Sequence, residues 1–296
     1  MLTGSSVALV TPMRADGAVD PEAWLRLLDF QLQAGTTAVV VGGTTGESAT
    51  LTDGELRQLV EAAVGHLRGR MLVIAGAGTS STATTVERVR WLGELGVDGL
   101  LIVTPAYVKP TQEGLYLHYA AAASVSRVPV VLYNVPGRTA VDMLPATVAR
   151  LALLPRIVAI KEAVPGAERV RELLAVSPAF TVLSGDDATA REAVLAGARG
   201  VISVTANVAP RPLRLMLEAA LAGDAAAAAR LDAPLARLHA DLFVEGNPIP
   251  VKWALHRMGM IDTGIRLPLT PLAAFAQPVV AEAMRVAGLL PAVGAN

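Results

Sequence analysis

The sequence contains no cysteine among its 296 residues. Disulfide bonds, thiolate nucleophiles and cysteine-ligated metals are therefore excluded, and the chain suits a reducing compartment. An excess of one charge is also lacking, because 25 basic and 26 acidic residues give a formal net charge of -1 without blocks of like charge. Such a chain has no positive electrostatic potential over its surface as a whole that would attract nucleic acid. We expect small molecules, and no nucleic acid, as its partners.

Long hydrophobic runs are missing too. The N-terminal stretch lacks the basic segment of a signal peptide. No apolar run reaches the roughly 18 residues of a membrane span, so we expect a cytoplasmic chain without a membrane partner. With 53% apolar residues the chain can bury a large core, either as one α/β barrel or as two smaller domains.

Lysine is the scarcest of the charged residues. Only Lys109, Lys161 and Lys252 are lysines, which leaves 22 of the 25 basic residues as arginines. Lys161 is the more unusual because it ends IVAIKEA, a run of aliphatic residues that is typical of a buried strand. Its position therefore needs a physical reason.

Eight short aliphatic runs alternate with segments of helical periodicity. They are continuous hydrophobic runs, as expected of parallel strands that are buried on both faces. The predicted strands cover 7–10, 38–41, 71–75, 99–103, 128–133, 157–160, 180–184 and 200–204. Between them, Pro21 and Glu22 open one predicted helix, and Thr52 with Glu55 forms a capping-box pattern at the start of another.

A recurring phrase marks the passage from helix to strand. It reads QAGTTAVVV from Gln33, ELGVDGLLIV from Glu94 and LAGARGVISV from Leu195. Each copy places a glycine after the helix, then a short turn and the strand, which is helix C-cap chemistry repeated in one unit. Eight such units predict a (β/α)8 TIM barrel over residues 1–224. The alternative is a doubly wound open sheet, which would need a phosphate-binding glycine loop at its first turn.

The last part of the chain is alanine-rich and has no further strand pattern. The predicted helices cover 211–221, 225–243, 250–258 and 271–287. We therefore expect residues 225–296 to form a helical appendage to the α/β barrel.

Polar residues follow almost every predicted strand. In a TIM barrel the reactive side chains collect at the carboxyl ends of the strands. These ends read GGTTGES, TPAY, YNVPGR, KEA, SGDD and SVTAN after the second, fourth, fifth, sixth, seventh and eighth strands. The sequence thus predicts hydroxyls, a guanidinium and an amine at one mouth of the barrel.

Lys161 has two interpretations. From spacing alone, a lysine that ends a buried strand is more often ion-paired, and Glu162 is next to it. Adjacent strand residues point to opposite faces, however, so a Lys161 that points into the barrel does not share a face with Glu162. A buried lysine amine can lose its proton and attack a carbonyl, which an arginine cannot do. Tyr133 and Thr44, at other strand ends, could supply the proton relay that imine formation needs.

The remaining polar motifs favour carboxylate binding over nucleotides or metals. GGTTGES has neither the GK[ST] signature nor the spacing of a dinucleotide fingerprint. Its glycines would let backbone N–H groups approach a small carboxylate. Arg138 could clamp a second one, although an isolated arginine is more often part of a surface salt bridge. Asp186 and Asp187 lack a histidine or third carboxylate nearby, so we expect a helix cap before 188–196 and no metal.

Eight motifs follow one another in the order of a known family. They are GGTTGESATL, VTPAY, EGLY, LYNVPGRT, IKEA, LSGDDA, GVISVTANV and FVEGNPIPVKWA. Over almost the whole chain the sequence resembles the dihydrodipicolinate synthases, within the Schiff-base lyase superfamily that also contains N-acetylneuraminate lyase. The resemblance implies condensation of pyruvate with L-aspartate 4-semialdehyde to 4-hydroxy-tetrahydrodipicolinate, which opens the diaminopimelate and lysine branch. It implies neither a metal nor an organic cofactor.

The resemblance implies four catalytic residues. Lys161 would form the imine with pyruvate, and Tyr133, Thr44 and Tyr107 would form the proton relay. Tyr107 would enter from a neighbouring subunit, in a homotetramer built from tight dimers. The pyruvate methyl would become an enamine carbon that attacks the aldehyde, before the amine of the second substrate displaces the lysine.

The resemblance also implies four substrate-binding residues. Thr45 would hold the pyruvate carboxylate, Arg138 would bind the carboxylate of the semialdehyde, and the backbone at Gly185 and Ile202 would line the pocket. The alternatives are a related aldolase that takes N-acetylneuraminate or another 2-oxo sugar acid, and a barrel that binds a 2-oxo acid without turnover. Arg138 within YNVPGRT favours the semialdehyde.

One departure from the family concerns feedback inhibition. In lysine-inhibited relatives the matching positions present imidazoles, an amide, a carboxylate and an aromatic ring. Here Ser48 and Ala49 remain, but the other positions carry Asp53, Leu56, Ser80, Thr84 and Ala106. Leu56 and Ala106 can neither hydrogen-bond to a ligand nor stack on it. We expect weak or absent inhibition by L-lysine, with a site rebuilt on Asp53 and Ser80 as the alternative.

Overall fold

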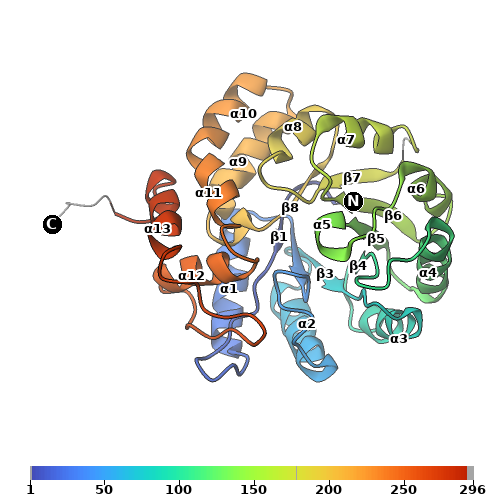
Figure 1. Ribbon diagram of the computed structural model, residues 1–296, viewed down its shortest axis with the longest axis horizontal. Helices are drawn as coiled ribbons and strands as arrows, with labels where there is room; N and C mark the ends of the chain where they lie inside the picture. Colours follow the sequence, from blue (N-terminus) through green and yellow to red (C-terminus); the bar gives the residue numbers. More distant parts are fainter. Residues whose placement is uncertain (1, 178, 292–296) are drawn as a thin grey trace.

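Eight parallel strands close into a barrel in chain order, and β8 pairs with β1. The computed structural model describes residues 2–177 and 179–291 (Figure 1). The strands are β1 (Gly4–Ala8), β2 (Ala38–Val41), β3 (Leu72–Gly76), β4 (Gly99–Val103), β5 (Val130–Asn134), β6 (Ile157–Glu162), β7 (Thr181–Ser184) and β8 (Gly200–Ser203). The predicted (β/α)8 TIM barrel is therefore confirmed.

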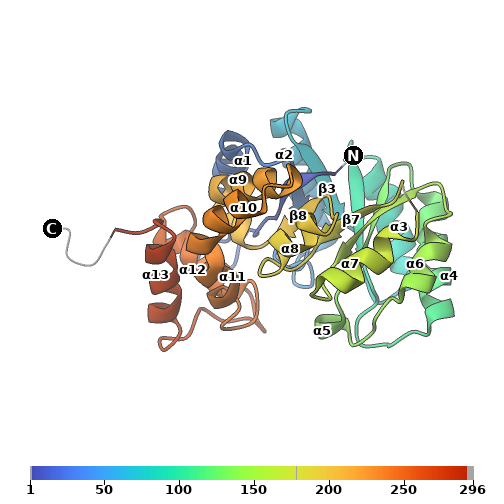
Figure 2. The ribbon, with the colours of Figure 1, turned by 90° about the horizontal axis from the view of Figure 1, so that it is seen from above.

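Helices surround this barrel (Figure 1). Those of the barrel are α1 (Pro21–Ala34), α2 (Asp53–Leu67), α3 (Thr82–Gly93), α4 (Gln112–Val125), α5 (Pro136–Thr139), α6 (Pro145–Leu151), α7 (Ala167–Leu174), α8 (Ala190–Leu195), η1 (Thr205–Asn207) and α9 (Pro210–Leu221). The C-terminal ones are α10 (Ala225–Asp232), η2 (Ala233–Leu235), α11 (Ala236–Asp241), α12 (Ile249–Arg257) and α13 (Gln277–Val286). Both views place α11, α12 and α13 together at one side of the barrel (Figure 1, Figure 2). No helix of the described residues is long and apolar enough to cross a membrane.

The helix signals of the sequence work as predicted. Thr52 and Glu55 form the capping box at the start of α2, each side chain meeting the backbone N–H of the other. The three glycines of the recurring phrase, Gly35, Gly96 and Gly197, all have positive φ values, of 77°, 82° and 114°. Gly35 is the C-cap of α1, and Gly96 and Gly197 follow the caps of α3 and α8. Because glycine adopts this conformation without a steric penalty, it turns the chain towards the next strand.

Three predicted elements differ from the structure by more than two residues at one end. The first strand was predicted at 7–10, but β1 begins at Gly4, because Ser5 and Ser6 are small enough to be buried in the barrel wall. The helix predicted over 225–243 is broken into α10, η2 and α11 around Pro234, which has no N–H to donate. The helix predicted over 271–287 begins only at Gln277, just before Pro278, a residue that favours the first helical turn.

Side chains alternate along the strands between two apolar layers. One layer fills the barrel and includes Val40, Leu101, Val131, Tyr133 and Ile202. The other lies between the strands and the surrounding helices and extends into the C-terminal region, where Val251 and Met284 belong to it. Burial on both faces explains why the strands are continuous hydrophobic runs.

The C-terminal region is joined to the barrel by a buried ion pair as well as by this layer. The Lys252 ammonium on α12 pairs with Glu47, which follows β2, and neither side chain is more than 5% exposed. The second carboxylate oxygen of Glu47 accepts a hydrogen bond from the backbone N–H of Arg266 at 3.2 Å. Arg266 also binds Glu55 and lowers the pKa of that carboxyl to about 2. The helical appendage that the sequence predicts thus holds the loop after β2, while its last residues, 292–296, lie outside the described part.

Lys252→Met tests this attachment, because it leaves the Glu47 carboxylate buried with one backbone donor. Removing one partner of a buried ion pair costs about 3–5 kcal/mol, so the urea concentration at half-unfolding, followed by circular dichroism, should fall markedly. Lys109→Met removes an exposed lysine and is the control. The double variant Glu47→Gln/Lys252→Met, which removes both charges, should recover much of the loss. A Lys252→Met midpoint equal to that of the wild type would contradict the assignment.

Candidate active site

Lys161 lies at the carboxyl end of β6 and points into the barrel. It is 5% exposed, and its neighbours at alternate positions, Ala159 and Ala163, belong to the layer inside the barrel. Tyr133 on β5 is its partner in the strand register. The Lys161 Nζ atom lies 4.3 Å from the centre of the Tyr133 ring. The structure therefore brings the predicted amine and the predicted relay tyrosine into contact.

Glu162 lies on the opposite face of β6, as the alternation of strand residues requires. Its carboxylate accepts hydrogen bonds from the Asn134 amide at 3.0 and 3.1 Å and from the Val164 N–H at 2.8 Å. Within residues 2–177 and 179–291, no acidic side chain pairs with Lys161. An amine without an acid beside it is available as a nucleophile.

The loop after β2 brings the two threonines to the same mouth. Thr44 lines a small cavity together with Tyr133. A Cβ atom on Gly76 of β3 would lie 2.1 Å from the carbonyl oxygen of Gly42. The loop after β2 can therefore approach β3 only because residue 76 is a glycine. Thr45 is buried, and its hydroxyl accepts a hydrogen bond from the Asn247 side chain at 2.9 Å.

A larger cavity of about 540 Å³ opens beside Thr44. Its wall includes Val135, Arg138 and Asn247 near the strand ends, and Ser48 and Ser80 farther along the loops. Arg138 is exposed, and its Nη2 atom donates a hydrogen bond to the Asn247 carbonyl at 3.3 Å. The cavity is wide enough for a small substrate and places a guanidinium on its wall.

Gly185 follows β7 and Ile202 lies on β8, the two strands after the one that carries the lysine. A Cβ atom on Gly185 would lie 3.0 Å from the Lys161 Cε atom, so the absence of a side chain leaves room for the lysine stem. The Gly185 N–H donates to the Glu162 carbonyl at 2.6 Å. Ile202 is 1% exposed in the same layer as Tyr133. Gly185 therefore packs against the lysine stem, whereas the pocket lining predicted for the backbone of both residues stays a prediction.

Tyr107 stands apart from the other predicted residues. It is 93% exposed and lines neither of these two cavities. Its φ of 72° is unusual for an aromatic residue and carries a strain cost that the surrounding structure must offset. Within one chain, the structure assigns it no contact with the site.

One feature of the site escaped the sequence analysis. Asn247 joins Thr45 to Arg138, although no role was predicted for it within FVEGNPIPVKWA. The signal that could have found this segment is Lys252, one of only three lysines, five residues farther on.

The helix cap expected at Asp186 and Asp187 does not come from Asp187. Its carboxylate is buried and accepts hydrogen bonds from the Val204 and Thr205 N–H groups, at 2.9 and 2.8 Å. The side chain reaches the end of β8 because parallel strands of a barrel end side by side. Asp186 does accept from the N–H of Thr189, the residue before α8, at 3.0 Å.

Comparison with known proteins gives one consistent result. A sequence model described as the dihydrodipicolinate synthetase family matches residues 1–287. Enzymes named 4-hydroxy-tetrahydrodipicolinate synthase from Methylococcus capsulatus and Alcanivorax borkumensis are each 54% identical to this chain over 98% of its length, covering 100% and 99% of theirs. The crystal structure of the chloride-inhibited dihydrodipicolinate synthase from Acinetobacter baumannii, complexed with pyruvate, is similar with a TM-score of 0.96 and 47% identity. It covers 98% of this chain and 100% of that one. The Thermotoga maritima enzyme has a TM-score of 0.95 and 40% identity over 98% and 100% of the two chains.

Proposed function

The chain belongs to the dihydrodipicolinate synthetase family, and we propose that it condenses pyruvate with L-aspartate 4-semialdehyde through an imine on Lys161. The product is 4-hydroxy-tetrahydrodipicolinate, and the activity is that of a lyase of lysine biosynthesis. The observation that carries the proposal is the Lys161 amine, which points into the barrel beside Tyr133 without an acidic partner.

Lys161 supplies the covalent step. Its nitrogen attacks the keto carbon of pyruvate, and the keto oxygen takes up protons and leaves as water, so that a protonated imine forms. Loss of a methyl proton converts the imine into an enamine, whose carbon forms a bond to the aldehyde carbon. The amine of the second substrate then attacks the imine carbon and displaces Lys161. Tyr133 and Thr44, which line one cavity, carry the protons for these steps.

Two residues bind the carboxylates of the substrates. The Thr45 hydroxyl already accepts a hydrogen bond from Asn247, so its own proton is free to be donated to the pyruvate carboxylate. Arg138 uses one nitrogen for the Asn247 carbonyl and keeps its other donors for the carboxylate of the semialdehyde. The backbone at Gly185 and Ile202 completes the pocket around the lysine.

Tyr107 completes the relay from a second subunit in our proposal. Its strained backbone presents the ring to solvent in the single chain, as expected of a side chain that a neighbouring copy receives. A symmetric dimer would give each copy the other's tyrosine. We propose two such dimers in a homotetramer.

Trapping with borohydride tests the imine. Incubation with pyruvate and sodium borohydride should add one reduced pyruvyl group per chain, as measured by intact-protein mass spectrometry. Lys161→Ala should take up none, and Lys109→Met is the matched control that keeps Lys161. An adduct that persists in Lys161→Ala would refute the mechanism. Product detection with pyruvate and aspartate semialdehyde, set beside N-acetylneuraminate cleavage, distinguishes the proposed activity from the sugar-acid alternative.

Complementation tests the role of Tyr107. Lys161→Ala and Tyr107→Phe should each have low activity alone, but their co-expressed mixture should regain part of it. In a mixed dimer one site combines a native Lys161 with a native tyrosine from the other copy. The readout is the steady-state rate of purified mixed oligomers carrying two different tags. Activity no greater than that of the separate variants would show that Tyr107 does not act across subunits.

We also propose that L-lysine inhibits this enzyme weakly or not at all. The two side chains on which the alternative inhibitory site would be built already have partners. Asp53 pairs with Arg88 at 2.7 Å, and the Ser80 hydroxyl donates to the Ala106 carbonyl at 2.9 Å. Leu56 is 2% exposed and packs in the core.

Steady-state rates measured with increasing L-lysine test this proposal. The rate should change little up to millimolar concentrations, and D-lysine at equal concentration controls for ionic strength. Strong inhibition by sub-millimolar L-lysine that D-lysine does not reproduce would contradict it.

A further inference from the structure

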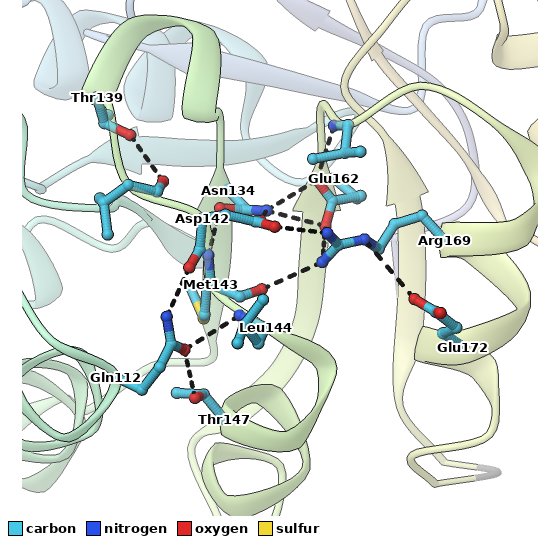
Figure 3. Close-up of polar contacts among 12 residues, drawn as sticks. Gln112, Asn134, Thr139, Asp142, Met143, Leu144, Thr147, Glu162, Arg169 and Glu172 are labelled. Carbon is cyan, nitrogen blue, oxygen red and sulfur yellow. Dashed lines mark hydrogen bonds and ion pairs between the residues drawn. The ribbon is translucent and has the colours of Figure 1, made fainter.

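A buried polar cluster around Asn134 and Glu162 lies on the face of β5 and β6 opposite to Lys161 and Tyr133. Figure 3 shows the contacts of this cluster. The next register partners on β5 and β6 are Asn134 and Glu162, and their side chains point to the outer face of the barrel. Asn134 is fully buried, and the Glu162 side chain is 1% exposed. Two polar residues thus connect the ends of the same two strands that carry the amine and the tyrosine.

The Asn134 amide joins three segments. Its Nδ2 atom donates to both oxygens of Glu162, at 3.0 and 3.1 Å, and to Asp142 at 2.7 Å. Its oxygen accepts from the Met143 N–H at 3.0 Å. Figure 3 shows the amide between the carboxylates of Asp142 and Glu162. The amide therefore ties β5 to β6 and to the segment before α6.

Glu162 also orders the chain that leaves the strand after Lys161. One carboxylate oxygen accepts from the Val164 N–H at 2.8 Å, two residues farther on. The Glu162 carbonyl accepts from the N–H of Gly185, the residue that packs against the lysine stem. Glu162 thus fixes the backbone that directly follows Lys161, where the hydrogen bonds between the strands end.

The charges around Glu162 are unevenly balanced. Arg169 on α7 lies 4.0 Å from Glu162 and 2.6 Å from Asp142, and Glu172 approaches the same guanidinium at 3.8 Å. Three carboxylates therefore share one positive charge. Burial raises the pKa of Glu162 to about 7, with Asp142 adding to the rise and the Val164 N–H, Asn134 and Arg169 opposing it. Every hydrogen bond to the Glu162 side chain is donated to its carboxylate oxygens, so the ionised form is the one that these contacts stabilise.

We propose that Glu162 is a positioning residue, whose carboxylate, bound by Asn134 and the Val164 N–H, fixes the end of β6 and so sets Lys161 beside Tyr133. The amine has no acid partner of its own in the described residues, so its place depends on the backbone that carries it. This inference rests on the proposed imine at Lys161. Protonation of Glu162 weakens the hydrogen bonds that its carboxylate accepts from Asn134 and the Val164 N–H. Imine formation therefore slows as the pH falls through the neutral range.

Glu162→Gln tests the inference without a change of size. The new amide nitrogen would face donors on Asn134 and Arg169, and a lost hydrogen bond to a charged group leads us to expect imine formation slower by about tenfold or more at pH 8. The rate of imine formation is measured by borohydride trapping with pyruvate. In steady state kcat should fall while kcat/KM for the semialdehyde stays unchanged, because that substrate reacts only after the imine has formed. Glu172→Gln, which alters an exposed carboxylate on the same arginine, is the matched control and keeps the wild-type rate.

Asp142→Asn provides a second test that does not alter Glu162. Removing the neighbouring negative charge lowers the pKa of Glu162, so the acidic fall in the rate of imine formation moves to lower pH, whereas Glu172→Gln leaves the profile in place. This variant decides the question if Glu162→Gln does not fold. A folded Glu162→Gln with the wild-type rate at every pH, or an unshifted Asp142→Asn profile, would overturn the inference. Failure of the wild type to form any adduct would instead refute the proposed function.

Discussion

The alternation of side chains along β5 and β6 is the constraint on which the site depends. It sends Tyr133 and Lys161 into the barrel and their sequence neighbours, Asn134 and Glu162, to the outer face. The lysine is therefore separated from the acid that follows it in the sequence. The same alternation places the Glu162 carboxylate on the outer face, where it binds Asn134 and the Val164 N–H and fixes the ends of both strands.

The two buried lysines of the chain are used in opposite ways. Lys252 pairs with Glu47 and attaches the C-terminal helices to the loop after β2. Lys161 has no such partner in the described residues and stays available for chemistry. Arginine would serve in neither place equally well, since it cannot lose its proton and its planar fork needs more room and more acceptors. At both buried positions the compact, single amine therefore matters.

The C-terminal region does more than cover one side of the barrel. Asn247, which precedes α12, contacts Thr45 through its side chain and Arg138 through its carbonyl. Those residues follow β2 and β5 and bind the two carboxylates in the proposed mechanism. One segment outside the barrel therefore sets the relative positions of both binding groups, and helical packing far from Lys161 bears on the geometry of the pocket.

The sequence by itself determined the barrel, the helix caps and the residues at its mouth, because these depend on local periodicity, on glycine and capping chemistry, and on the rule that parallel strands end at one face. It placed the first strand too late, since Ser5 and Ser6 are buried without being apolar. Only the tertiary structure decided which polar groups meet. The contacts between Glu47 and Lys252, Thr45 and Asn247, and Asp187 and the end of β8 join residues far apart in the chain, and no local pattern encodes such distances. The direction of the Lys161 side chain depended on both. The sequence showed that Lys161 and Glu162 point to opposite faces of the strand, but only the closed barrel shows that the Lys161 face is the inner one.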